Sequence, residues 1–149
     1  VLVLSGAASR GVALQFLGDL EQLRTNCRHV DGNRVDVARS IALAGSDAVG
    51  VVLDLRRYER WVLDALQWAR DADSWVVALT DSVLSPLTAM ADCSFVVAAA
   101  STGPFDRHVG TLALLDLFVV EVAAARRGAA TERVDLLEAA WGSAGALVD

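Results

Sequence analysis

Short apolar runs alternate along the chain with segments of helical periodicity. The apolar runs predict five strands, at residues 1–5, 27–30, 48–53, 75–79 and 93–98. Helices are expected between them, at residues 9–24, 35–44, 57–70 and 86–91, and after the last strand at 105–127 and 131–141. Strands that alternate with helices in this way form a parallel sheet covered on both faces.

The length and the number of strands narrow the topology. A chain of 149 residues is the size of one domain, and such a domain buries about 68–70% of its unfolded surface. We therefore expect residues 1–149 to form a single α/β domain. Right-handed crossovers leave few arrangements, and five strands favour a flavodoxin-like three-layer α/β/α sandwich with strand order 2-1-3-4-5. Ligands of such folds bind where the first and third strands end, at the switch point of the sheet.

The loop after the first strand, "SGAASRG", consists mainly of small residues between a strand end and a helix start. Its backbone N–H groups could bind an anion, with Ser9 adding a hydroxyl. It could equally be a tight turn in which Ser9 caps the helix. The loop is neither a P-loop, since no lysine follows the glycines, nor a dinucleotide-binding G-x-G-x-x-G.

The loop after the third strand, "DLRRYER", places Arg56 and Arg57 at the expected start of a helix. Positive charge there opposes the helix dipole, so an anion from a ligand or from Asp54 is expected to compensate. We expect one arginine, Arg56, to point inward to a ligand and the other to turn outward or to pair with Asp54. Alternatively, Asp54 and Glu59 pair with both arginines in a solvated cluster.

Three further residues are candidates for ligand contacts. Thr80 and Asp81 end the fourth strand at the edge of the expected crevice, although Asp81 could simply cap its turn. His108 lies with Asp106 at the start of the long helix, where it could act as an acid or base or belong to a surface or interface. We assign no catalytic residue, no metal ligand and no cofactor.

The segment 105–127 is apolar nearly all round, with Asp116 and Glu121 its only charges between Val109 and Ala125. These interruptions argue against a membrane span. A helix that is apolar on all sides must be covered on all sides, and one sheet face cannot do so. We therefore predict a partner subunit, in a homodimer or a higher homo-oligomer.

Composition and charge exclude several classes of protein. The chain is 54% apolar and 21% charged, which is typical of a globular domain. Its net charge of −6 argues against binding of nucleic acid by a basic face. Cys27 and Cys93 fall on strands expected at opposite sheet edges, so no disulfide follows and a cytoplasmic protein is predicted. The sequence opens directly as a strand, without a signal peptide, which suggests a domain of a longer chain.

One stretch, "VVALTDSVLSPLTAMADCSFVV", resembles the strand, Thr-Asp turn and Ser-Pro-Leu helix of sugar isomerase (SIS) domains of the RpiR type. The resemblance covers nearly the whole chain. The family's first phosphate loop, Gly-x-Gly-x-Ser, corresponds to Ser5–Ser9, where only Ser9 is kept. The second, Ser-x-Ser-Gly-x-Thr, corresponds to Leu53–Tyr58, where Leu-Asp-Leu-Arg-Arg-Tyr stands instead. The chain thus resembles a variant with Arg-Arg-Tyr at the second phosphate motif.

The resemblance implies a regulatory domain of a bacterial transcriptional regulator that senses a sugar phosphate or a related small anion. DNA binding would belong to a helix-turn-helix domain on the N-terminal side of this sequence. Because guanidinium groups bind phosphate bidentately, the arginines could preserve the anion site, or they could fill the crevice through Arg–Asp pairs. We favour the first. The predicted ligand-binding residues are Ser5, Ser9, Asp54, Arg56, Arg57, Thr80, Asp81 and His108.

Two alternatives remain open at this point. One is a sugar-phosphate aldose–ketose isomerase of the same fold, and the other is a dimerisation module with a degenerate pocket. The isomerase would need a base to move a proton between adjacent carbons, and Glu59 and His108 are the candidates. Neither lies in a recognisable acid–base motif, and Arg56 lies close to Glu59. We therefore predict that the domain is not an enzyme.

Overall fold

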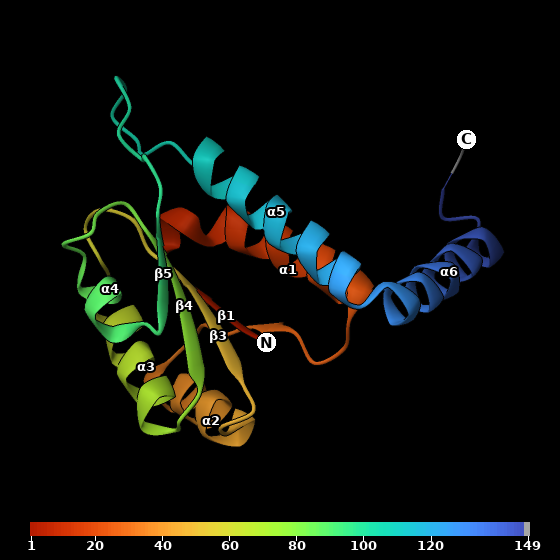
Figure 1. Cartoon of the computed structure of the whole chain (residues 1–149), viewed down its shortest axis with the longest axis horizontal. Helices are drawn as coiled ribbons and strands as arrows, with labels where there is room; N and C mark the ends of the chain where they lie inside the picture. Colours follow the sequence, from red (N-terminus) through yellow and green to blue (C-terminus); the bar gives the residue numbers. More distant parts are fainter. Residues whose placement is uncertain (148–149) are drawn as a thin grey trace.

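Five parallel strands form the centre of the computed structural model, which describes residues 1–147 (Figure 1). They pair in the order β2-β1-β3-β4-β5, which confirms the predicted order. The strands are β1 (Leu2–Ser5), β2 (Arg28–His29), β3 (Val49–Leu53), β4 (Trp75–Thr80) and β5 (Cys93–Val96). Every pairing is parallel, as expected for strands joined by helical crossovers.

Helices cover both faces of the sheet, so the three-layer sandwich is confirmed (Figure 1). One face carries α1 (Arg10–Leu23) and α5 (Val109–Ala125), and the other carries α2 (Arg34–Ala44), α3 (Arg60–Asp71) and α4 (Pro86–Met90). Side-chain caps fix two of the helix starts. Asn33 accepts from the backbone N–H groups of residues 35 and 36 before α2, and Ser85 accepts from that of residue 87 before α4.

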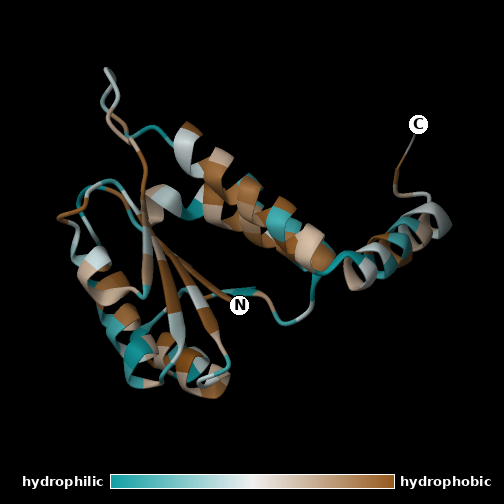
Figure 2. Cartoon of the chain, in the orientation of Figure 1, coloured by the Kyte–Doolittle hydropathy of each residue, from teal (hydrophilic) through white to brown (hydrophobic). Residues whose placement is uncertain are grey.

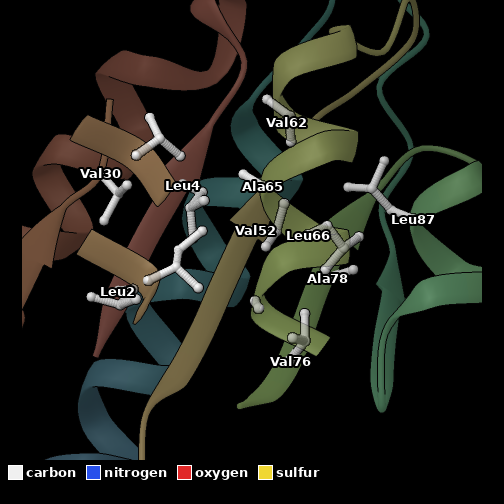
Figure 3. Close-up of a cluster of buried hydrophobic side chains, with 13 residues drawn as sticks. Leu2, Leu4, Val30, Val52, Val62, Ala65, Leu66, Val76, Ala78 and Leu87 are labelled. Atoms are coloured by element: carbon white, nitrogen blue, oxygen red, sulfur yellow. The ribbon is translucent and has the colours of Figure 1, made fainter. Parts of the chain in front are cut away.

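Alternation along the strands divides the core between the two faces. Leu2 and Leu4 of β1 face α2 and α3, whereas Val3 faces α1. Figure 3 shows the first of these clusters, in which strand side chains meet those of the helices. Its members are buried apolar residues, namely Leu2, Leu4, Val30, Val37, Ile41, Val52, Val62, Ala65, Leu66, Ala69, Val76, Ala78 and Leu87.

The C-terminal helices differ from the prediction in their boundaries. The expected helix at 105–127 begins only at Val109 in α5, and the expected helix at 131–141 is the longer α6 (Arg127–Ala144). Arg126, with φ −120° and ψ 28°, separates the two helices. In Figure 1, α6 extends away from the sheet. Its Arg133 side chain donates to the carbonyl oxygen of Glu21 on α1, with Nε and O 2.7 Å apart.

Figure 2 shows that α5 is apolar along most of its length, as predicted. The exposed fractions of its side chains show that only one side of the helix is covered. Leu115 packs against the sheet and is 1% exposed, whereas Val109, Leu112 and Val120 on the outer side are 44–70% exposed. Within residues 1–147, no helix is both long enough and apolar enough to cross a membrane.

Candidate ligand-binding site

Two loops meet at the carboxyl ends of the central strands, as the strand order requires. Ser5 of β1 pairs with Leu53 of β3. The backbone N–H of Gly6 donates to the carbonyl oxygen of Leu53 at 3.0 Å. The β1–α1 loop (residues 6–9, including the short 3-10 helix η1, Ala7–Ser9) and the β3–α3 loop (residues 54–59) are therefore neighbours at the switch point.

Asp54 is a buried carboxylate between these loops. It is 3% exposed, and its Oδ2 accepts a hydrogen bond from the backbone N–H of Glu59 at 2.7 Å. A Cβ at Gly6 would lie 2.3 Å from Oδ1 of Asp54, so glycine alone fits beside the carboxylate. Burial raises the pKa of Asp54 to about 6, and the hydrogen bond from Glu59 partly opposes this rise. Asp54 was predicted to belong to the site. In the structure it binds Glu59 in the β3–α3 loop and packs against Gly6 in the β1–α1 loop.

The side chain of Glu59 joins the two loops. One carboxylate oxygen accepts from the backbone N–H of Ala7 in the β1–α1 loop. The other accepts from Nε1 of Trp61, at 2.7 Å. Glu59 is also the residue that precedes α3. The alternative in which Glu59 pairs with the arginines in a solvated cluster is therefore wrong in this structure, because a backbone donor and an indole donor bind its carboxylate.

The two arginines do not start a helix, in contrast to the prediction. They lie in the β3–α3 loop, and α3 begins at Arg60, where the backbone N–H of the preceding residue is bound by Asp54. Arg57 has the left-handed φ of +69°, which a helix start would not allow. Neither arginine therefore lies in the first turn of α3, where its charge would oppose the helix dipole.

The side chains of the two arginines differ in their partners. Nη2 of Arg56 lies 2.8 Å from Oδ1 of Asp106 in the segment before α5. Arg57 is exposed and, within residues 1–147, its side chain forms no hydrogen bond or ion pair. Neither arginine pairs with Asp54, and the exposed side chain of Arg57 agrees with the other predicted outcome, in which the second arginine turns outward. Of these two guanidinium groups beside the site, only that of Arg57 has no partner in the described part of the chain.

Asp81 lies in the site, whereas Thr80 does not. Oδ1 of Asp81 accepts from the Tyr58 hydroxyl at 2.8 Å and from the backbone N–H of Arg56 at 3.1 Å. Asp81 therefore supports the β3–α3 loop. Thr80 is fully buried, and its hydroxyl donates to Oγ of Ser85 at 2.8 Å. Its predicted ligand contact is wrong for this structure, because its side chain is bonded in the interior.

Ser5 takes part in a chain of polar contacts toward the sheet edge. Its Oγ lies 3.1 Å from Nε2 of His29 on β2, and Nδ1 of His29 lies 3.4 Å from Asp31. Arg10 of α1 pairs with the same Asp31 at 2.8 Å. Burial lowers the pKa of His29, and Asp31 partly opposes this. His29 was missed from the sequence because only the pairing of β1 with β2 brings it to Ser5.

Two predicted residues have buried polar atoms without a partner in the described part of the chain. Ser9 is 1% exposed, and its Oγ makes no hydrogen bond, so it does not cap α1 through its side chain. Nδ1 of His108, which precedes α5, is also buried and unpaired. The described residues contain no group of three or more His, Cys, Asp or Glu placed to hold a metal ion.

Comparison with known proteins decides the family. The model of the SIS domain family matches residues 1–121. The chain belongs to the SIS domain family. This match confirms the predicted resemblance to SIS domains. None of the curated proteins compared with this SIS domain matches it in sequence.

Solved structures similar to this SIS domain include a domain of a transcription factor and a protein complexed with a sugar phosphate. The sugar isomerase domain of an RpiR transcription factor from Sphaerobacter thermophilus is 23% identical, with a TM-score of 0.86 over 92% of this chain and 76% of that chain. The NanR protein of Vibrio vulnificus, complexed with ManNAc-6P, is 20% identical, with a TM-score of 0.71 over 99% of this chain and 56% of that chain.

A third similar structure is a protein of Methanococcus jannaschii with an inferred 3-hexulose-6-phosphate isomerase function. It is 14% identical, with a TM-score of 0.67 over 89% of this chain and 75% of that chain. At these identities the likeness shows a shared fold. The same fold thus occurs in a transcription factor, in a protein complexed with ManNAc-6P and in a protein with an inferred isomerase function.

Proposed function

We propose that this SIS domain is the ligand-sensing domain of a bacterial transcriptional regulator, and that its ligand is a sugar phosphate or a related small anion. The observation that carries the proposal is the meeting of the β1–α1 loop with the arginine-bearing β3–α3 loop at one sheet edge. Backbone N–H groups and guanidinium groups are the donors that proteins use for phosphate. The likeness to the RpiR domain and to NanR with ManNAc-6P supports this ligand class.

Arg57 is the first ligand contact in this proposal. It is exposed beside the site, and its guanidinium has no partner within residues 1–147. Arg56 is already held by Asp106, so a ligand would have to replace that carboxylate. The structure therefore shifts our preference from Arg56 to Arg57, with Arg56 as a second donor once Asp106 is released.

We further propose that the domain is not a catalyst. A base for isomerisation needs a free carboxylate or imidazole directed at the substrate. Both carboxylate oxygens of Glu59 accept hydrogen bonds, from Ala7 and from Trp61. His108, whose Nδ1 is buried and unpaired in the described part of the chain, is then the candidate base that the isomerase alternative retains. The isomerase alternative, which the fold of the Methanococcus protein favours, predicts turnover of a sugar phosphate that is lost in Glu59→Gln or His108→Ala.

Calorimetric titration tests the sensing function. We expect ManNAc-6P or another sugar phosphate to release heat on binding, and the unphosphorylated sugar of the same structure to give none. Arg57→Ala should weaken binding by about 1.5–3 kcal/mol, the scale of a hydrogen bond to a charged group. The matched control is Arg39→Ala on α2, whose side chain pairs with Asp36. Equal binding of phosphorylated and unphosphorylated sugars would contradict the proposal.

We also propose that the domain forms a homodimer through α5 and α6. The outer side of α5 exposes Val109, Leu112 and Leu117, and α6 exposes Leu136. A groove of about 550 Å³ runs between α5 and α6. A second copy would cover these apolar residues, as helices apolar on all sides require. Sedimentation at micromolar concentration should show a dimer, and a monomer alone would contradict this.

DNA recognition, in this proposal, belongs to a separate helix-turn-helix domain in the full protein. The net charge of −6 makes the domain itself a poor match for the phosphates of a duplex. A regulator that recognises DNA in this way acts in the cytoplasm. An electrophoretic mobility assay on the domain alone should therefore show no DNA binding.

A further inference from the structure

The β1–α1 loop already holds an anion, and this anion belongs to the chain itself. The backbone N–H of Ala7 donates to one carboxylate oxygen of Glu59, at 2.5 Å. Nε1 of Trp61 donates to the other oxygen, at 2.7 Å. Under the proposed function, the N–H groups of this loop are the donors that would receive the ligand's phosphate. In the free domain, the carboxylate of Glu59 occupies one of them.

The carboxylate is held in this position by the backbone. The N–H of Glu59 donates to Oδ2 of Asp54, and this contact fixes the residue directly before α3. The same Asp54 packs so closely against Gly6 that no side chain fits there. The β1–α1 loop and the start of α3 are therefore joined through two carboxylates. A flexible surface side chain would show no such set of contacts.

The loop also retains an unused donor. Ser9 is 1% exposed, and its Oγ has no hydrogen-bond partner among residues 1–147. Buried polar atoms are normally paired, so this hydroxyl marks a site whose hydrogen bonds are incomplete. The Glu59 carboxylate accepts a hydrogen bond from the backbone N–H of Ala7 but forms none with the Ser9 hydroxyl.

We infer that Glu59 is a built-in competitor for the anionic group of the ligand. A phosphate can take the Ala7 N–H only when the Glu59 carboxylate leaves it, because two anions on one donor repel each other. The inference rests on the proposed function and adds a selectivity to it. Glu59 rejects weak monovalent anions, and a ligand displaces it only when its phosphate and its sugar bind together.

The test measures inorganic phosphate binding to wild type, Glu59→Ala and Glu59→Gln by calorimetry. We expect phosphate to bind Glu59→Ala at least about tenfold more tightly than wild type, since one charge-assisted hydrogen bond becomes free. Glu59→Gln should fall between the two, because it loses the charge but keeps an acceptor for Ala7. The matched control is Glu132→Ala on α6, which is exposed and should bind phosphate as wild type does.

A second readout follows the displaced carboxylate directly. The indole N–H signal of Trp61, assigned by its loss in Trp61→Phe, should shift when ManNAc-6P is added to wild type, because displacement of Glu59 removes the acceptor of this N–H group. Phosphate affinity in Glu59→Ala equal to or below that of wild type would overturn the inference. If Glu59→Ala does not fold, Glu59→Gln decides, and unchanged affinity there overturns it as well.

The two proposals fail separately. The wild-type domain could bind sugar phosphates while neither Glu59 variant gains affinity for phosphate. That result would support the sensing function and contradict the role of Glu59 as a competitor. A gain in phosphate affinity in the variants, with no sugar phosphate binding to wild type, supports the competitor and contradicts the sensing function.

Discussion

Replacing Asp54 with asparagine tests whether the carboxylate between the two loops is buried at an energetic cost. Asp54 is 3% exposed and accepts from the backbone N–H of Glu59. Burial raises its pKa from 3.8 to about 6. The neighbouring carboxylates of Glu59 and Asp81 add to the rise. At pH 7 the Asp54 carboxyl is therefore mostly ionised, although its buried surroundings favour the protonated form.

The sign of the effect follows from linkage. The folded state holds the proton of Asp54 up to about pH 6, whereas the unfolded state releases it near 3.8. Between these values the folded state binds more protons, so the contribution of Asp54 to stability rises as pH falls from 6 to 3.8. Above the pKa of about 6 in the folded state, the full free-energy cost of burying the ionised Asp54 carboxylate is present. The difference between the two pKa values corresponds to about 3 kcal/mol.

We expect Asp54→Asn to be more stable than wild type at pH 7 by about 1–2 kcal/mol. Asparagine removes the buried charge, and its weaker hydrogen bond to Glu59 offsets part of the gain. The advantage should disappear near pH 4. The free energy of unfolding in urea is measured for both proteins from pH 4 to 8, with exposed Asp47→Asn as control. A difference between Asp54→Asn and wild type that does not change with pH would refute the reasoning.

Three further substitutions test the packing around the site, each by urea unfolding. Gly6→Ala should cost about 1–3 kcal/mol because its Cβ would overlap Asp54, and the double variant with Asp54→Gly should recover most of the loss; an equal loss in both backgrounds would contradict this. Ser85→Ala should lower the free energy of unfolding by about 2–4 kcal/mol, since it removes the cap of α4 and leaves the buried Thr80 hydroxyl unpaired. A loss below roughly 0.5 kcal/mol, which is typical of a surface substitution, would contradict this. Leu115→Ala should cost about 2–5 kcal/mol, and a small loss would show that α5 does not pack on the sheet as described.

Most of the fold could be predicted because its signals are local. Each strand is a short apolar run, and the alternation with helices restricts the strand order. The ends of the helices were harder to predict from the sequence, because contacts between distant residues determine where a helix begins and ends. The start of α3 moved from residue 57 to Arg60, since the carboxylate of Asp54 binds the N–H of Glu59 and Arg57 adopts a left-handed conformation. No periodicity in the sequence encodes these contacts.

The candidate site could be predicted only in its location. The sequence placed Asp54, Asp81 and the two arginines at one sheet edge, and the structure shows them there. It gave no indication that Glu59 would bind the backbone of the β1–α1 loop, because that contact spans 52 positions. Arg56 was likewise expected to point to a ligand, whereas an acidic residue 50 positions away holds it.

We propose that a sugar phosphate binds where the β1–α1 and β3–α3 loops meet. A titration of the ¹⁵N-labelled domain with a sugar phosphate, followed by two-dimensional NMR, locates the ligand residue by residue. We expect saturable shifts of the backbone signals of Ala7, Ser9 and Arg57, with unchanged signals along α6. Shifts confined to α5 and α6, or no saturable shift in either loop, would contradict it.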